Sequence, residues 1–181
     1  MPDGARRAIV DGGAGSARKD LMDRTRAIHA IRSGGQTGVD RGALDAARAV
    51  GVPICGWCPS GGWAEDAPTP PGILTAYPEL QETPSPDPVQ RTEWNVRDSD
   101  ATLIVQPQEG ARSPGTDATA RFAEAYDKPF LVVGGVDVPV VARWLEGLAS
   151  PIRLNVAGPR ESECPGAYRI SHELVTALLS R

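Results

Sequence analysis

The stretch from Ala30 to Ala47, "AIRSGGQTGVDRGALDAA", decides the fold of this chain. The stretch begins at the end of an apolar run and contains three closely spaced glycines. A pattern typical of a helix begins at Asp40 and Arg41. A strand, a glycine-rich turn and a helix in this order are typical of a unit whose backbone amides approach an anion. The turn matches neither G-x-G-x-x-G nor the P-loop pattern, and it lacks the P-loop lysine. Nucleotide hydrolysis of the P-loop type is therefore disfavoured.

Strands and helices alternate along the rest of the chain. Apolar runs predict strands at 27–33, 52–57, 101–106, 129–134 and 152–158. Apolar residues at helical spacing predict helices after the glycine turn, ending at a Gly51 C-cap, and at 89–98, 115–127, 137–149 and 171–180. Such alternation predicts right-handed βαβ units. We therefore expect an α/β protein, a Rossmann-like three-layer sandwich with a mainly parallel sheet of about five strands.

Length and composition set the domain organisation. The 181 residues suit one domain. We expect a flexible N-terminal extension at 1–24 and a single Rossmann-like ligand-binding domain at 25–181. The connection at 59–88 is rich in proline and glycine, and connections of this length are usually functional or disordered.

Charge and hydropathy exclude several classes of partner. The net charge of −4 argues against a mainly electrostatic nucleic-acid binder. No apolar run approaches the roughly 18 residues that a membrane span needs. The N-terminal residues have no apolar core of a secretory signal, so we expect a cytoplasmic protein.

The "CGWC" motif at Cys55–Cys58 has the spacing of a redox pair. A redox pair normally begins at a helix N-terminus, whereas Cys55 falls in a predicted strand and Pro59 continues into a loop. A zinc site would need further ligands, and His29 and His172 do not have the required spacing. We expect Cys55 to be a buried strand residue.

Ligands of open parallel sheets bind at the carboxyl ends of the strands, where four polar segments of this chain are expected. Their composition of glycines, hydroxyls, amides and arginines suits a phosphorylated small molecule. The predicted ligand-binding residues are Gly34, Gly35, Gln36, Thr37, Gly38, Asp40 and Arg41 after the first strand, Arg91, Thr92 and Asn95 on the helix at 89–98, Ser113, Gly115, Thr116 and Thr119 at the start of the next helix, and Asn155, Gly158, Arg160, Glu161 and Ser162 after the last strand. We predict no catalytic residue and no metal ligand.

Structural roles remain open for several of these residues. Asp40 can complement the helix dipole, and Arg41 can pair with Asp45. Arg91 can instead pair with Asp98 or Glu93 on a solvated helix. Thr116 can be a plain N-cap, and Arg160–Glu161 can be a surface pair.

Eight blocks of sequence occur in the order of a known family: "SGGQTGVDRGALDAA", "GWCP", "AEDA", "YPELQET", "QRTEWNVRDSDATLIV", "PGTDAT", "DKPFLVV" and "LNVAGPRES". Across about residues 28–170 the chain resembles the molybdenum carrier family, within the LOG (lysine-decarboxylase-like) Rossmann superfamily. The resemblance implies binding of molybdenum cofactor (molybdopterin), with its phosphate in the glycine loops. It also implies a homo-oligomer, a dimer or tetramer, with molybdoenzymes as candidate recipients.

The chain departs from its relatives at two places. LOG enzymes carry a catalytic Glu in a P-G-G-x-G-T-x-x-E loop, and alignment on the G-T of "PGTDAT" puts Thr119 at that position. Phosphoribohydrolase chemistry is therefore doubtful. In the carrier family we expect a basic residue near position 63 and a glycine after "AED", whereas this chain has Trp63 and Ala67.

Three functions follow from the sequence. The first is a protein that binds, carries or stores molybdenum cofactor without catalysis. The second is a nucleotide-binding enzyme of the phosphoribohydrolase type, and the third is a nucleotide-sensing module. All three use the same glycine loops.

Overall fold

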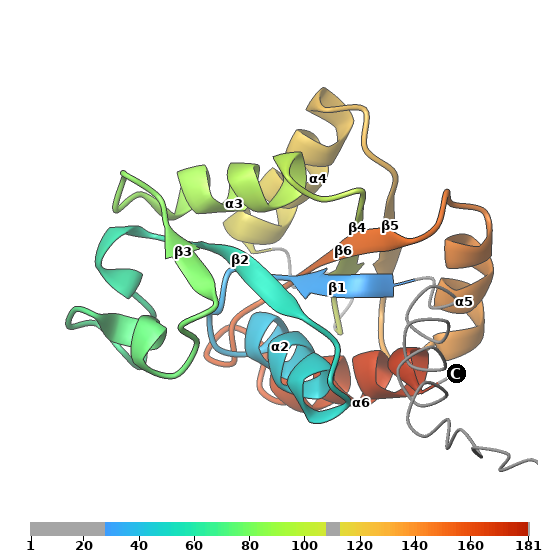
Figure 1. Ribbon diagram of the computed structural model, residues 1–181, viewed down its shortest axis with the longest axis horizontal. Coiled ribbons are helices and arrows are strands. Elements are labelled where there is room, and N and C mark those ends of the chain that lie inside the picture. The colour runs from blue at the N-terminus through green and yellow to red at the C-terminus, as the bar shows by residue number, and fades with distance from the viewer. Residues whose placement is uncertain (1–27, 108–112, 181) are drawn as a thin grey trace, which may run out of the picture.

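The structure, a computed structural model, describes residues 28–107 and 113–180. The expected extension at 1–24 lies outside them. Within the described residues, six parallel strands form one sheet flanked by five α-helices (Figure 1). The strands are β1 (Ile28–Arg32), β2 (Ile54–Cys58), β3 (Leu80–Glu82), β4 (Ala101–Val105), β5 (Phe130–Val133) and β6 (Ile152–Ala157). The helices are α2 (Val39–Ala49), α3 (Pro88–Arg97), α4 (Pro114–Ala125), α5 (Val138–Glu146) and α6 (Ala167–Leu179).

The strand order is β3-β2-β1-β6-β4-β5, and every neighbouring pair is parallel. The last strand of the chain, β6, therefore lies between β1 and β4. The carboxyl ends of these three strands therefore lie side by side at the same edge of the sheet.

The predicted α/β, Rossmann-like fold is confirmed, with one strand more than the five expected. The additional strand is β3, whose three residues pair with β2 from within the long connection. Only Leu80 of β3 is buried, so no apolar run marked it in the sequence.

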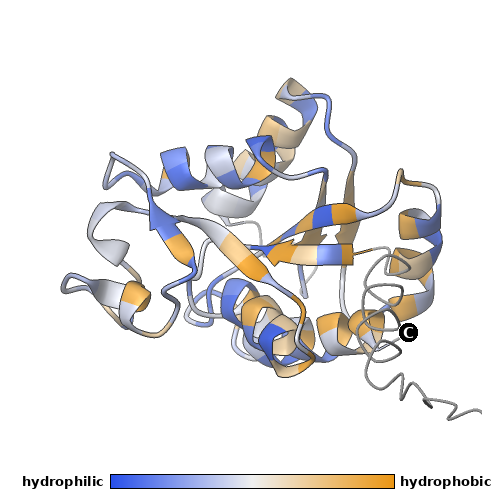
Figure 2. Ribbon diagram, in the orientation of Figure 1, coloured by the Kyte–Doolittle hydropathy of each residue, from blue (hydrophilic) through white to orange (hydrophobic). Residues whose placement is uncertain are grey.

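The two faces of the sheet are covered by different helices (Figure 1). Helices α2 and α6 pack together on one face, with α5 beside α6, and α3 and α4 pack together on the other. Figure 2 shows hydrophobic residues along the central strands and alternating with hydrophilic residues along the helices, as in amphipathic helices.

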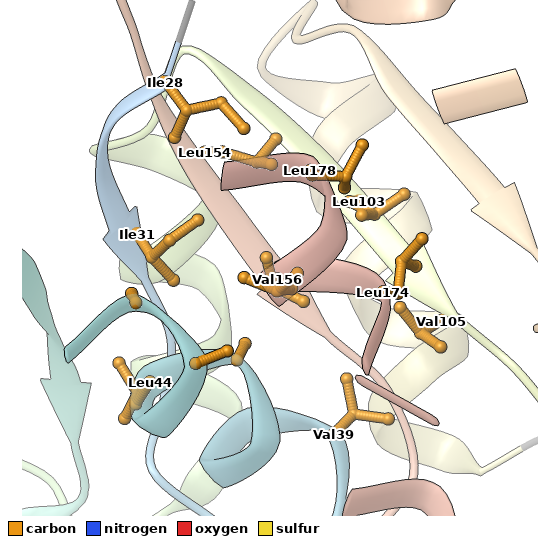
Figure 3. Close-up of a cluster of buried hydrophobic side chains, with 14 of the residues drawn as sticks. Ile28, Ile31, Val39, Leu44, Leu103, Val105, Leu154, Val156, Leu174 and Leu178 are labelled. Atoms are coloured by element: carbon orange, nitrogen blue, oxygen red, sulfur yellow. The ribbon is translucent and has the colours of Figure 1, made fainter. Parts of the chain in front are cut away.

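The core lies between the sheet and the α2–α6 layer (Figure 3). Strand residues point from the sheet toward residues of the two helices. Those with no exposed surface include Ile31, Leu103, Leu154 and Val156 from the sheet and Val39, Leu44 and Leu174 from the helices. Truncating any of these leucines to alanine is expected to cost about 2–5 kcal/mol of unfolding free energy.

Helix α2 ends one residue before the prediction, with Val50 as its C-cap and Gly51 next to it, and the start of α6 also differs from the prediction. Gly51 follows α2 with φ +72°, and its N–H donates to Arg48 O at 3.2 Å. Helix α6 begins at Ala167, four residues before the predicted 171. The reason is Glu161, whose carboxylate accepts the N–H groups of Gly166 (2.6 Å) and Tyr168 (2.9 Å) and so caps the helix from upstream.

Across residues 28–107 and 113–180, no helix has both the length and the apolar character needed to cross a membrane.

Candidate functional site

The candidate site is built on the glycine loop, residues 33–38, which joins β1 to α2 at the carboxyl edge of the sheet. The segment after β6 packs directly against this loop. The Val39 N–H donates to Pro159 O at 3.2 Å, and the Glu161 N–H donates to Thr37 Oγ1 at 3.2 Å. Two of the four predicted ligand-binding segments are thus in contact, as the position of β6 beside β1 requires.

Two glycines of the loop adopt backbone conformations that other residues rarely reach. Gly35 has φ +74° and Gly38 has φ +77°. A Cβ on Gly38 would also lie 2.5 Å from Pro159 O. Gly38 occupies the N-cap of α2 and provides no side-chain hydrogen bond. No side chain caps the start of α2, where the Val39 N–H donates to Pro159 O and Asp40 places a negative charge in the first turn, next to the positive end of the helix dipole.

A buried ion pair spans the glycine loop. Arg91 Nη1 of α3 donates to Asp40 Oδ2 of α2 at 3.1 Å. Asp40 is only 3% exposed and also accepts the N–H of Gln36 at 3.3 Å. Burial raises the pKa of Asp40, and the positive charge of Arg91 opposes this shift. The predicted residues Asp40 and Arg91 thus meet across the loop.

Arg91 fills the space beside Gly34. A Cβ on Gly34 would lie 2.0 Å from Arg91 Nη1. The Nε atom of Arg91 is buried and has no hydrogen-bond partner among the described residues. A buried donor without an acceptor costs about 1–3 kcal/mol, so an acceptor supplied by a ligand would be favourable here.

The alternative structural pairings of Arg41 and Arg91 are wrong. Arg41 forms a two-pronged ion pair with Asp66 (2.5 and 2.7 Å). Asp45, the expected partner, instead accepts the hydroxyl groups of Tyr77 and Tyr168. The alternative partners of Arg91 are engaged elsewhere: Asp98 pairs with Arg97, and Glu93 accepts the hydroxyl of Tyr126.

A short segment of the long connection lies on the glycine loop. We call residues 63–66 the strap. The side chain of Gln36 bonds its backbone at two points, donating to Trp63 O at 3.4 Å and accepting from the Glu65 N–H at 3.2 Å. Together with the Arg41–Asp66 ion pair, these bonds fix the strap on the loop.

Glu65 of the strap joins three loops. Its carboxylate accepts the hydroxyl of Thr37 on one oxygen and the hydroxyl of Ser162 (2.6 Å) on the other. Partial burial acts to raise the pKa of Glu65, but the hydrogen bonds from Ser162 and Thr37 outweigh it and lower the pKa. The hydrogen bond from Arg41 likewise lowers the pKa of Asp66.

The strap residues were missing from the predicted site. Their signals in the sequence were the unusual length of the connection and the "AEDA" block.

The family of the chain follows from its similarity to known proteins. The profile of the circularly permutated YpsA SLOG family matches residues 31–179. The chain belongs to this family. It is also similar to a solved structure, a "Putative molybdenum carrier protein" from Syntrophus aciditrophicus, with 38% identity and a TM-score of 0.73. The similarity covers 87% of this chain and 99% of that one. No curated protein matches the chain.

In this SLOG-family chain, the ligand-binding residues predicted on α3 have different contacts: one lies against the glycine loop and another bonds to the sheet. Asn95 is buried and bonds the backbone of Trp57 twice, accepting from its N–H (2.8 Å) and donating to its carbonyl (2.9 Å). Thr92 donates to Pro88 O within α3 at 3.0 Å. Asn95 therefore joins α3 to β2, while Arg91 lies against Gly34 of the glycine loop.

The residues predicted at the start of α4 bond to their own helix. Ser113 is the N-cap, accepting the Thr116 N–H at 3.2 Å, so the expected N-cap at Thr116 is wrong. Thr119 donates to Gly115 O at 2.8 Å. A Cβ on Gly115 would meet nothing closer than 3.9 Å, so this glycine is not sterically required. Ligand binding at this second helix start stays a prediction.

The residues predicted after β6 have distinct contacts. Asn155 is buried in β6 and donates to Thr102 Oγ1 at 3.3 Å. Gly158 allows close packing, since a Cβ there would lie 2.3 Å from Val105 O. Arg160 lies over the ring of Trp63, with 5.4 Å between Cζ and the ring centroid. Glu161 caps α6, so the alternative surface pair with Arg160 is not formed by its carboxylate.

A surface hollow of about 720 Å³ lies between α4 and the edge strand β5. Ile104, Thr116, Arg121 and Val132 are among the residues lining it. Of the predicted site residues, Thr116 is the one that lines this hollow, and the glycine loop does not reach it.

Proposed function

We propose that this chain binds and carries molybdenum cofactor, a phosphorylated pterin that holds molybdenum, and that it does so without catalysis. One observation carries the proposal: Arg91, whose guanidinium lies beside Gly34 near the start of α2, has a buried Nε with no hydrogen-bond partner among the described residues. A phosphate is the group that such a combination of guanidinium, loop amides and helix dipole binds best.

The residues fit a phosphate group. Gly34 lets the Arg91 guanidinium lie directly against the loop backbone, Gly35 and Gly38 set the curvature of the loop, and Arg91 supplies the charge. The guanidinium has five N–H donors in a planar fork, so bonding to Asp40 leaves donors for a second acceptor. Asp40 would hold Arg91 in place while the phosphate bonds to it.

The identity of the cargo rests on similarity. A protein named as a molybdenum carrier shares 38% of residues with this chain over most of both lengths. The proposal includes the homo-oligomeric state, the cytoplasmic location and the molybdoenzyme recipients expected from the sequence.

A nucleotide-binding role is the second candidate, because Arg91 and the glycine loop would bind any phosphate monoester. Hydrolysis of a nucleotide is disfavoured by the engagement of the nearby carboxylates. Asp40 is paired with Arg91, Asp66 with Arg41, and Glu161 caps α6. Thr119 stands where LOG enzymes have their Glu, and its hydroxyl bonds to its own helix.

The test compares Arg91→Gln with Arg97→Gln, a matched change on the same helix at a residue that pairs with Asp98. Each protein is purified from cells that synthesise the cofactor, and bound pterin and molybdenum are quantified per chain. We expect the wild type and Arg97→Gln to carry pterin, and Arg91→Gln to bind about 10- to 100-fold more weakly. Equal pterin content in a folded Arg91→Gln protein would refute the proposal. Binding of nucleoside monophosphates in place of pterin would favour the second candidate.

A further inference from the structure

Trp63 lies at the edge of the glycine loop in a fixed position. Its carbonyl accepts from Gln36 Nε2, and the strap continues into Glu65 and Asp66, which bond to Thr37 and Arg41. The backbone of Trp63 is therefore held against the loop through its neighbours and its own carbonyl. The side chain is only partly buried, so its ring retains exposed surface.

The ring of Trp63 makes a cation–π contact with the planar guanidinium of Arg160. The Arg160 guanidinium lies 5.4 Å from the ring centroid, and Arg160 comes from the segment after β6 that packs on Gly38. Trp63 and Arg160 thus reach the loop from two different segments and meet beside it. An aromatic face that attracts a guanidinium also stacks with planar heterocycles.

The other neighbours of the loop glycines are fixed protein groups. Arg91 and Asp40 fill the space at Gly34, Ile73 and Leu80 fill the space at Gly35, and backbone of residues 159–161 fills the space at Gly38. The Arg160–Trp63 contact is different in kind, because it joins two side chains that are both partly exposed.

The remaining aromatic residues near this end of the sheet are engaged in the fold. Trp57 and Trp94 pack edge to face at 4.9 Å, and the Trp57 indole N–H donates to Asp98 at 2.8 Å. Tyr77 is buried and donates to Asp45 at 2.7 Å.

We propose that Trp63 is the stacking surface for a planar heteroaromatic ring of the ligand, a purine or a pterin, whose phosphate is held by the glycine loop. Arg160 covers the ring face in the free protein and leaves it when the heterocycle binds. This inference rests on the proposed phosphate site and adds the chemical class of the rest of the ligand.

The experiment measures binding by calorimetry of three probes: AMP, a pterin phosphate and ribose 5-phosphate, which has no ring. The variants are Trp63→Ala, Trp63→Phe and, as a control on α5, Trp144→Phe. We expect Trp63→Ala to weaken the ring-bearing probes by about 5- to 100-fold and Trp63→Phe to weaken them less. Ribose 5-phosphate should bind all four proteins equally. The ring-bearing probes should also quench a part of the tryptophan fluorescence that Trp63→Phe lacks and Trp144→Phe keeps.

The possible failures are distinguishable. If ribose 5-phosphate binds and Trp63→Ala binds the ring-bearing probes as tightly as the wild type, the stacking inference is refuted and the phosphate site stands. If none of the three probes binds the wild type, the proposed function and the inference both fail. The probe that binds more tightly, AMP or the pterin phosphate, identifies the preferred heterocycle as a purine or a pterin.

Discussion

Arg91 lies against Gly34 so closely that a single methyl group on the glycine would displace it. The added Cβ would lie 2.0 Å from Arg91 Nη1 and 3.0 Å from Asp40 Oδ2. Gly34 is not among the glycines with positive φ, so the requirement at this position is one of space. The Asp40–Arg91 ion pair therefore joins α2 and α3, which lie on opposite faces of the sheet, and it packs against the backbone of Gly34.

Replacing Gly34 by Ala is expected to push Arg91 away and break its bond to Asp40. We expect a loss of about 1–3 kcal/mol in unfolding free energy, measured by urea denaturation, together with weaker phosphate binding. Gly135→Ala is the matched control, because nothing lies within 4 Å of a Cβ there. Equal stability of the two variants would show that Arg91 can move without cost.

The strap should detach in acid. The pKa values of Glu65 and Asp66 are lowered in the folded protein, so these carboxyls stabilise it above their unfolded pKa values. That stability is lost as the pH falls below the ordinary pKa values of these carboxyls and through their lowered pKa values in the folded protein. Glu65→Gln should therefore lower the urea midpoint at pH 7 and lower it less at pH 3. The control, Glu173→Gln on exposed α6 surface, should leave the strap unaffected. A Glu65→Gln effect that is the same at both pH values would contradict this account.

Cys55 and Cys58 should not form a disulfide. They are three residues apart in β2 and point to opposite faces of the strand, with Cα atoms about 10 Å apart, beyond disulfide range. Cys55 is partly exposed rather than fully buried as expected, whereas burial raises the pKa of Cys58 to about 11. Thiol titration of the folded protein should modify Cys55 first and Cys58 only on unfolding. A Cys55–Cys58 peptide found by mass spectrometry after mild oxidation would overturn the prediction.

Glu161→Ala should destabilise α6. The substitution removes the acceptor of two N–H groups at the start of the helix, and loss of a cap costs about 1–2 kcal/mol. The unfolding free energy is the measurement, and Glu173→Ala is the control on the same helix. If the stability is unchanged, water replaces the carboxylate at no cost and the cap is not structural.

The sequence predicted features that depend on neighbouring residues. Alternating apolar runs predicted the α/β fold, and the position of Gly51 predicted the end of α2, because periodicity and C-caps are local. Residues 34–38 with Asp40 and Arg41 were predicted as one binding segment, because glycines at a strand-to-helix turn let backbone amides approach an anion.

Long-range contacts were not predictable in the same way. One alternative for Arg41 was a pair with Asp45 four residues away, but Arg41 pairs with Asp66 across the long connection. Arg91 and Asn95 share one side of α3 by spacing, yet one reaches the loop and the other reaches β2. The partner of each side chain depends on where the strands place the neighbouring loops. The spacing of residues along one helix does not contain this information.

The strap is attached through Gln36 by its main chain, at Trp63 O and the Glu65 N–H. Neither bond involves the side chain at position 63. A substitution of Trp63 is consequently expected to change the side chain that the strap presents beside the glycine loop without removing either hydrogen bond that attaches the strap to Gln36.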